Sequence, residues 1–192
     1  HQQGVLLKLA QMALKLRDQK AAEKWLKTFL LQNSTAVQFD QVLLWYLSLI
    51  QQTEWNFSLE DWFQMGLVAQ KRAHHELALS FFDRAINLYQ QNPKNPSWYE
   101  NCLWKKISSY RRTQQFSKAI ETINDMLAHE KDSKKRNMLF TQLASMHTRN
   151  GNYKEGISIY DNIQATNIER NTENPQFMPA WYRFESGNYK ES

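Results

Sequence analysis

The chain has 192 residues, of which 42% are hydrophobic and 22% charged, so it can bury a sizeable core in one domain or a short repeat array. This composition excludes a disordered chain, and the length excludes two full enzyme domains. Five glycines and four prolines are too few for the regular turns of a β-sandwich or barrel, which favours helices. A formal net charge of +5 at pH 7 favours acidic partners without requiring nucleic acid.

Apolar and small residues recur along the chain with the spacing of a helix face. In the first stretch, Leu6, Leu9, Ala10 and Ala13 stand at i, i+3, i+4 and i+7. Similar stripes begin at three later leading residues, which are Trp62, Leu103 and Phe140. Sixteen residues after each leading residue comes a small residue, and these four are Ala22, Ala78, Ala119 and Gly156. Because each small residue opens a second stripe, every unit is predicted to be two antiparallel helices that cross at the small residue.

These stripes divide the chain, taken as a single fragment over residues 1–192, into successive units. The predicted units cover residues 3–35, 59–95, 98–132 and 134–170. Between the first two, residues 36–52 form another amphipathic helix without a second stripe, so 36–58 is treated as an irregular helical insertion. Ser58 with Asp61 predicts an N-cap, and the Asn and Pro residues between 92 and 96 predict a helix break. Residues 172–192 are predicted to be an incomplete unit or a cap.

The pattern resembles the tetratricopeptide repeat (TPR) family, and residues 140–163 are the best match. They carry a bulky residue, Leu beside a small residue, a Gly-Asn-Tyr turn, and an aromatic residue on the second helix. The leading residues are spaced by 56, 41 and 37 positions, whereas the family's period is about 34. The resemblance implies an all-α, right-handed superhelical solenoid of antiparallel helix pairs. It also implies that the first helices line a concave groove.

Candidate partner-binding residues lie beside the packing stripe on the first helices, where the resemblance places the groove. They are Phe63, Leu67, Gln70, Trp104, Lys105, Ser108, Arg111, Thr141, Gln142 and Ser145. Apolar anchors beside amide and basic groups suit a protein or peptide segment with hydrophobic and acidic side chains. We therefore predict a non-catalytic protein-interaction domain without cofactor or small-molecule substrate. The alternative interpretation is that Phe63 and Trp104 only cover the edge of the core.

Catalytic and metal-binding motifs are present only as near matches. His75-Glu76 begins like the helix motif of zinc proteases, but Leu79 stands where the second His is required. The segment from Gly156 to Tyr160 lacks the second Gly of a nucleophile elbow and falls within a predicted helix. A lone Cys102 can form neither an internal disulfide nor a paired-cysteine metal site. We expect no enzymatic activity and no metal.

Two other functions compete with the interaction domain. One is a peptide-sensing or regulatory module of a larger regulator, such as a bacterial one. The other is RNA or nucleic-acid binding through a basic set comprising Lys105, Lys106, Arg111, Arg112, Lys131, Lys134, Lys135 and Arg136. A solvated face accounts better for this set, because no aromatic residues interleave with it periodically for base stacking. Nucleic acid is therefore the less favoured partner.

The sequence gives few signals for a membrane, a compartment or a neighbouring molecule. Its longest apolar run, residues 42–50, is far shorter than the roughly 20 residues that span a bilayer. The compartment stays open, with the cytoplasm weakly favoured. The face carrying Tyr160 and Ile163 lacks a predicted cover, so we expect either residues 172–192 to fold back on it or a second molecule to pack there.

Overall fold

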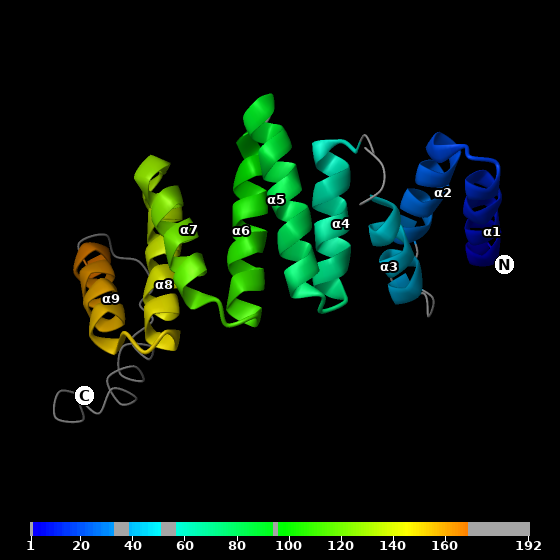
Figure 1. The fold of residues 1–192 in the computed structure, drawn as a ribbon. Helices are drawn as coiled ribbons and strands as arrows, with labels where there is room; N and C mark the ends of the chain where they lie inside the picture. Colours follow the sequence, from blue (N-terminus) through cyan, green and yellow to red (C-terminus); the bar gives the residue numbers. More distant parts are fainter. Residues whose placement is uncertain (1, 33–38, 51–56, 94–95, 169–192) are drawn as a thin grey trace. The chain divides into compact units, whose positions relative to one another are not determined.

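The computed structural model describes residues 2–32, 39–50, 57–93 and 96–168, and within these ranges its secondary structure is entirely helical (Figure 1). This confirms the predicted all-α class. The helices are α1 (Gln2–Lys15), α2 (Gln19–Gln32), α3 (Phe39–Ile50), α4 (Leu59–Lys71), α5 (His75–Gln91), α6 (Pro96–Arg112), α7 (Phe116–His129), α8 (Ser133–Arg149) and α9 (Tyr153–Ile168). The chain forms two compact units, residues 1–105 and 106–192, so the boundary falls inside α6. The predicted cap at 172–192 lies outside the described residues.

Three of the four predicted helix pairs, α1–α2, α4–α5 and α8–α9, pack together as the stripes indicate. α1 packs against α2 and α4 against α5 in the first unit, and α8 packs against both α7 and α9 in the second. The small residues of the second helices are buried, with exposed fractions of 0% for Ala22, Ala78 and Ala119. Gly156 is buried too, and a Cβ added there would lie 3.0 Å from the carbonyl oxygen of Ala144 on α8. Small residues therefore mark places where two helices approach closely, as predicted.

The same left-handed turn separates the two helices of each pair. Eleven residues after each leading residue, φ is positive: 58° at Arg17, 62° at Ala73, 59° at Gln114 and 85° at Gly151. The N–H of the next residue then donates to a carbonyl five positions back. These bonds are Asp18 to Ala13 and His74 to Ala69 at 2.9 Å, Gln115 to Tyr110 at 2.9 Å and Asn152 to His147 at 2.8 Å. This is the hydrogen bond of a Schellman motif, which ends a helix and redirects the chain.

An additional helix, α3, accounts for the long spacing between the first two leading residues. It packs against α2 and lies within the predicted segment 36–52. Its first turn is held by Asp40, which accepts a 2.9 Å hydrogen bond from Arg72 and lies 2.9 Å from Nε2 of His74. Hydrogen bonds from His74 and Arg72 lower the pKa of Asp40 below its usual value. α3 is therefore tied to the turn between α4 and α5.

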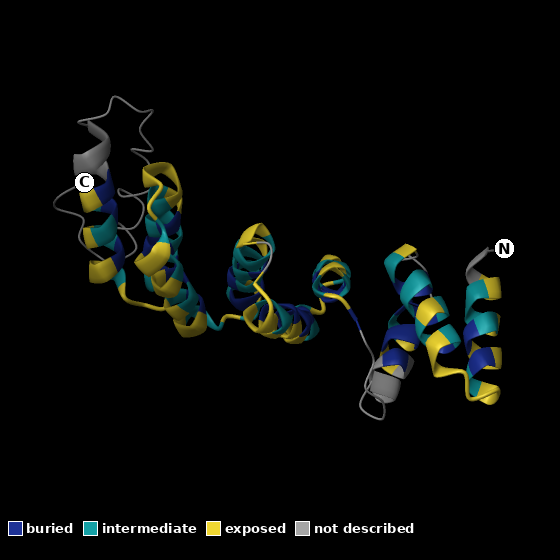
Figure 2. Ribbon diagram, turned by 90° about the horizontal axis from the view of Figure 1, so that it is seen from above, coloured by how far each residue is buried: buried dark blue, intermediate teal, exposed yellow. Residues whose placement is uncertain are grey.

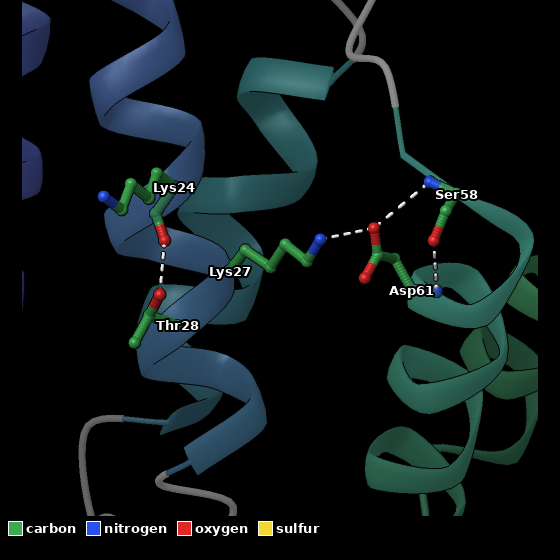
Figure 3. A network of polar contacts seen from close by, with 5 residues as sticks. All are labelled: Lys24, Lys27, Thr28, Ser58 and Asp61. Atoms are coloured by element: carbon green, nitrogen blue, oxygen red, sulfur yellow. Dashed lines mark hydrogen bonds and ion pairs between the residues drawn. The ribbon is translucent and has the colours of Figure 1, made fainter.

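A second tie joins α2 directly to α4 despite the inserted helix. Ser58 is the predicted N-cap and forms a capping box with Asp61, since each backbone N–H donates to the other residue's side chain, at 3.1 and 3.2 Å. The Asp61 carboxylate also pairs with the Lys27 ammonium of α2 (Figure 3). Burial raises the pKa of Asp61, but the hydrogen bonds from Lys27 and Ser58 outweigh burial and leave the pKa below its usual value. One carboxylate thus begins α4 and holds it against α2.

Aromatic rings form the centre of the first unit's core. Tyr46 contacts Phe57, Phe57 meets Trp62 edge to face, and Trp62 contacts Phe81, with centroid distances of 5.6, 4.9 and 5.7 Å. These contacts connect α3, α4 and α5. They stabilise the core because large rings bury much apolar area and add pairwise attraction. In the second unit, a smaller cluster joins Ala144 of α8 to α9.

The left-handed turns predict opposite effects for a matched pair of substitutions. An L-residue in this conformation costs about 1–2 kcal/mol, which glycine avoids. We expect Ala73→Gly to raise the free energy of unfolding by about 1 kcal/mol and Gly151→Ala to lower it by a similar amount. Urea titrations of both variants measure this. Equal signs for the two changes would contradict the role assigned to the turn.

The close helix crossings predict a cost for adding a single methyl group. A Cβ at Gly66 would overlap the ring of Phe82, and one at Gly156 would overlap the hydroxyl of Thr148. Gly66→Ala and Gly156→Ala should each lower the free energy of unfolding by about 1–3 kcal/mol through overpacking, and Ala78→Leu should do the same. Gly4→Ala in α1 is the control, because nothing lies within 4 Å of the added Cβ there. That variant should gain about 0.5–1 kcal/mol from helix propensity. Thermal and urea unfolding of all four variants measure these changes.

The lowered pKa of Asp61 predicts a pH-dependent contribution to stability. A carboxyl whose folded pKa lies below its unfolded value stabilises the protein above about pH 4, and this contribution is lost as the pH falls through the folded pKa. Asp61→Asn should therefore cost about 1 kcal/mol at pH 7 and progressively less below about pH 4. Glu60→Gln removes an exposed acid from the same helical turn and is the matched control. A constant deficit from pH 7 to about pH 3 would contradict this interpretation.

Candidate functional site

The predicted partner-binding residues divide between the two compact units. Phe63, Leu67, Gln70, Trp104 and Lys105 belong to the first unit. The second unit carries the other five, which are Ser108, Arg111, Thr141, Gln142 and Ser145. Nine of the ten are partly exposed, as a surface beside a packing stripe requires, and Phe63 is the exception.

In the first unit, α4 and α6 are neighbours that run in the same direction. The rings of Phe63 and Trp98 meet edge to face with centroids 4.8 Å apart, and Gln70 Nε2 donates to the carbonyl oxygen of Lys105 at 3.1 Å. Both contacts join residues 35 positions apart, so α4 and α6 keep one register from the first contact to the second. The half-exposed Leu67 of α4 and Trp104 of α6 are thereby carried on adjacent first helices.

Phe63 is a core residue, which corrects its assignment as an exposed anchor. Its side chain is only 6% exposed and contacts the rings of Phe82 at 5.9 Å and Trp98 at 4.8 Å. The alternative interpretation, in which the ring covers the core edge, is therefore correct for Phe63. The physical reason is that Trp98, in the first turn of α6, covers the position beside the Trp62 stripe. Leu67 packs on the same core but keeps part of its surface open.

The second unit presents a more polar surface on α8. Thr141, Gln142 and Ser145 are all half-buried, and the Thr141 hydroxyl donates to the Asn137 carbonyl of its own helix at 2.8 Å. Arg111, in the last turn of α6, is partly exposed and supplies positive charge. These groups can accept or donate hydrogen bonds to a partner, and Arg111 can pair with an acidic group.

The basic set does not form a uniform solvated face. Arg136 donates from Nη1 to the carbonyl oxygens of Leu127 and Glu130 at 2.7 and 2.9 Å, so its guanidinium caps the end of α7. α7 ends without a glycine, and its last carbonyls need another donor. Lys135 lies 3.8 Å from a Glu130 carboxylate oxygen, whereas Lys134 is exposed. The basic set therefore includes Arg136, which stabilises a helix end.

A hollow of about 350 Å³ lies between α8 and α9 in the second unit. It is lined by Ser133, Arg136, Asn137, Phe140, Ile159, Asn162 and Ile163. The sequence left the side chains of Tyr160 and Ile163 without a predicted cover, but they are only 3% and 9% exposed. Tyr160 and Ile163 pack in a cluster with Ala144, so the open feature at this face is the hollow beside them.

The remaining candidate groups have structural positions. Cys102 is 1% exposed and belongs to the first unit's core. Within the described ranges, no group of three or more His, Cys, Asp or Glu side chains is placed to hold a metal ion. The described helices also include none that is long and apolar enough to cross a bilayer.

The sequence matches no protein-family model and no curated protein. Its structure is similar to that of the nearly identical TPR-like repeats of a Podospora anserina protein described as a putative kinesin light chain. A single-residue variant of those repeats gives a TM-score of 0.60 at 14% identity, covering 97% of this chain and 87% of that chain. A second crystal structure of these repeats gives 0.56 at 14% identity over 97% and 88% of the two chains.

A tetratricopeptide repeat protein from Parabacteroides merdae gives a TM-score of 0.48 at 15% identity, covering 96% of this chain and 73% of that chain. The two Podospora structures carry the comparison, and at this level of identity they establish the fold. Together with the helix pairs and their turns, they show that this chain is a TPR-type helical repeat, as the sequence pattern predicted.

Proposed function

We propose that the chain is a non-catalytic protein-interaction module that binds a peptide or partner segment on the exposed faces of its first helices. The observation that carries this proposal is the pairing of α4 with α6 through Phe63–Trp98 and Gln70–Lys105. This pairing holds two first helices in one register, so their partly exposed side chains form a preorganised surface. A preorganised surface binds with a smaller loss of conformational entropy.

The residues of this surface define the chemistry of the ligand. Leu67 and Trp104 supply apolar area, and a half-exposed Trp is among the side chains that most often anchor an interface. Lys105 and Arg111 supply positive charge, and none of the ten candidate residues is acidic. The favoured ligand is therefore an extended or helical segment with both hydrophobic and acidic side chains.

We assign the polar side chains of α8 to a candidate ligand surface within the second unit. Thr141, Gln142 and Ser145 offer hydroxyl and amide groups but no charge, so they suit the backbone of a ligand better than its acidic side chains. On the surface of α4 and α6, we assign most of the binding energy to the apolar side chains of the first unit.

Trp104→Ala should weaken binding by on the order of 2 kcal/mol, because it removes the largest partly exposed apolar group of the surface. Arg111→Ala should cost less, about 0.5–1 kcal/mol, and its effect should shrink with added salt because an exposed charge is screened. The measurement is a screen of synthetic peptides graded in acidic and aliphatic content, followed by titration of the tightest ligand against each variant.

The matched control replaces the exposed Lys131 and Lys134 with Ala, because these residues carry the same charge outside the proposed surface. It should leave affinity unchanged, and all variants should keep the unfolding midpoint of the unmodified chain. If this control abolishes binding while Trp104→Ala and Arg111→Ala do not, the basic set is the binding surface and the first-helix assignment is wrong.

A further inference from the structure

One face of α1 carries apolar residues that are exposed to solvent, and Figure 2 colours the exposed residues of this helix yellow. Val5, Met12 and Leu16 are 55%, 58% and 76% exposed, and Leu9, which lies between them on the helix surface, is half-buried. Val5, Leu9 and Met12 share one face of α1. Leu16, the residue that follows the helix, continues this face because its N–H donates to the carbonyl oxygen of Met12 at 3.0 Å. We call these four residues the α1 stripe. α2 covers a different face of α1, where Ala10 and Ala13 are buried.

The equivalent face of α8 shows what the α1 stripe is suited to contact. When the leading residues Leu6 and Phe140 are matched, Val5, Leu9 and Met12 correspond to Leu139, Leu143 and Met146. Those α8 residues are only 1%, 6% and 0% exposed. α8 has α9 on the side of Ala144 and Thr148 and also packs against α7, so we assign α7 to the face that carries Leu139 and Met146. The α1 stripe thus has the character of a first-helix face that receives another helix.

Basic residues border the α1 stripe on the side away from α2. Lys8 and Lys15 are exposed and stand on α1 next to Met12. α1 itself contains no acidic residue. A helix lying on the stripe would therefore place one edge against two positive charges, and acidic side chains at that edge would be favoured.

We propose that the α1 stripe docks an amphipathic helix of a protein partner, whose aliphatic side chains cover Val5, Leu9, Met12 and Leu16 and whose acidic side chains face Lys8 and Lys15. This contact is separate from the first-helix surface described above, because it uses the opposite edge of its helix. It reproduces on α1 the contact that α7 makes with α8 inside the chain.

The probe is a synthetic, end-capped peptide with the sequence of residues 115–130, which comprises α7. It is a suitable test ligand because α7 packs against α8, the equivalent first helix, and because Glu121, Asp125 and Glu130 outnumber its one lysine, Lys118. We expect saturable one-to-one binding to the full chain by calorimetry. A photoreactive leucine at Leu127 of the peptide should crosslink to residues 5–16.

Two variants of the chain test the apolar and the charged parts of the contact. Met12→Ser with Leu16→Ser should weaken peptide binding about tenfold or more, whereas Met138→Ser, a methionine equally exposed at 59% on α8, should leave it unchanged. Lys8→Gln with Lys15→Gln should weaken binding about threefold at low salt, and Lys131→Gln with Lys134→Gln should not. Because all these side chains are exposed, the unfolding midpoints should not change.

Several results would overturn the proposal. The absence of saturable binding would do so, as would binding that survives Met12→Ser with Leu16→Ser or crosslinks that fall on α4 or α6. If the free chain instead self-associates with increasing concentration, and Met12→Ser with Leu16→Ser abolishes this, the stripe is covered by a second copy and not by a partner helix. If both double lysine variants weaken binding equally, the effect of charge is not specific to the α1 stripe. The acidic edge assigned to the partner helix is then wrong.

Discussion

The left-handed residue between paired helices is the constraint on which the rest of the structure depends. It ends the first helix at a fixed distance from its leading residue, and the following N–H closes the turn on a carbonyl of the last helical turn. The second helix must then start at the same point in each pair. Its small residue, sixteen positions after the leading residue, is consequently buried in each pair, and at Gly156 an added Cβ would come too close to the first helix.

The inserted helix α3 shows how the first unit accommodates an interruption of the repeat. α2 and α4 still touch, because the Asp61 carboxylate that caps α4 also pairs with Lys27. Nearby, burial raises the pKa of Glu23, while the charge of Lys27 lowers it. The positive charge of Lys27 thus lowers the pKa of both carboxyl groups. Only Asp61, which also accepts a backbone hydrogen bond from Ser58, has a pKa below its usual value. α3 therefore adds packing surface without displacing the helix that follows.

The helix pairs could be predicted from the sequence because their information is local and periodic. Leading residues and small residues recur at one offset, and this offset depends only on the lengths of a helix and a turn. The left-handed conformations of Arg17, Ala73 and Gln114 could not be predicted, since none of these residues favours positive φ and the packing of the two helices imposes it. Only Gly151 carried a recognisable signal.

Burial at the candidate site was harder to predict, because it depends on which neighbouring helix covers which position. Phe63 stands one residue beyond the packing stripe, so the sequence suggested an exposed anchor. Trp98 covers it instead, from a helix that begins after the break at residues 92–96. The capping role of Arg136 also depended on a helix end without glycine, and the sequence alone did not indicate which cation would serve it. Periodicity shows which residues share a face, whereas the arrangement of the helices decides what covers that face.

The short reach of the turns has a consequence for the rate of folding. A three-residue connection brings the two helices of a pair together, so a hairpin such as α4–α5 can form with little loss of chain entropy. The ties between hairpins in the first unit join residues only 32 to 35 positions apart, as in Asp40–Arg72 and Gln70–Lys105. Closing these larger loops costs only slightly more, because the entropy of closure grows logarithmically with length. Such low contact order is typical of chains that fold in microseconds to milliseconds, with each hairpin serving as a template for its neighbour.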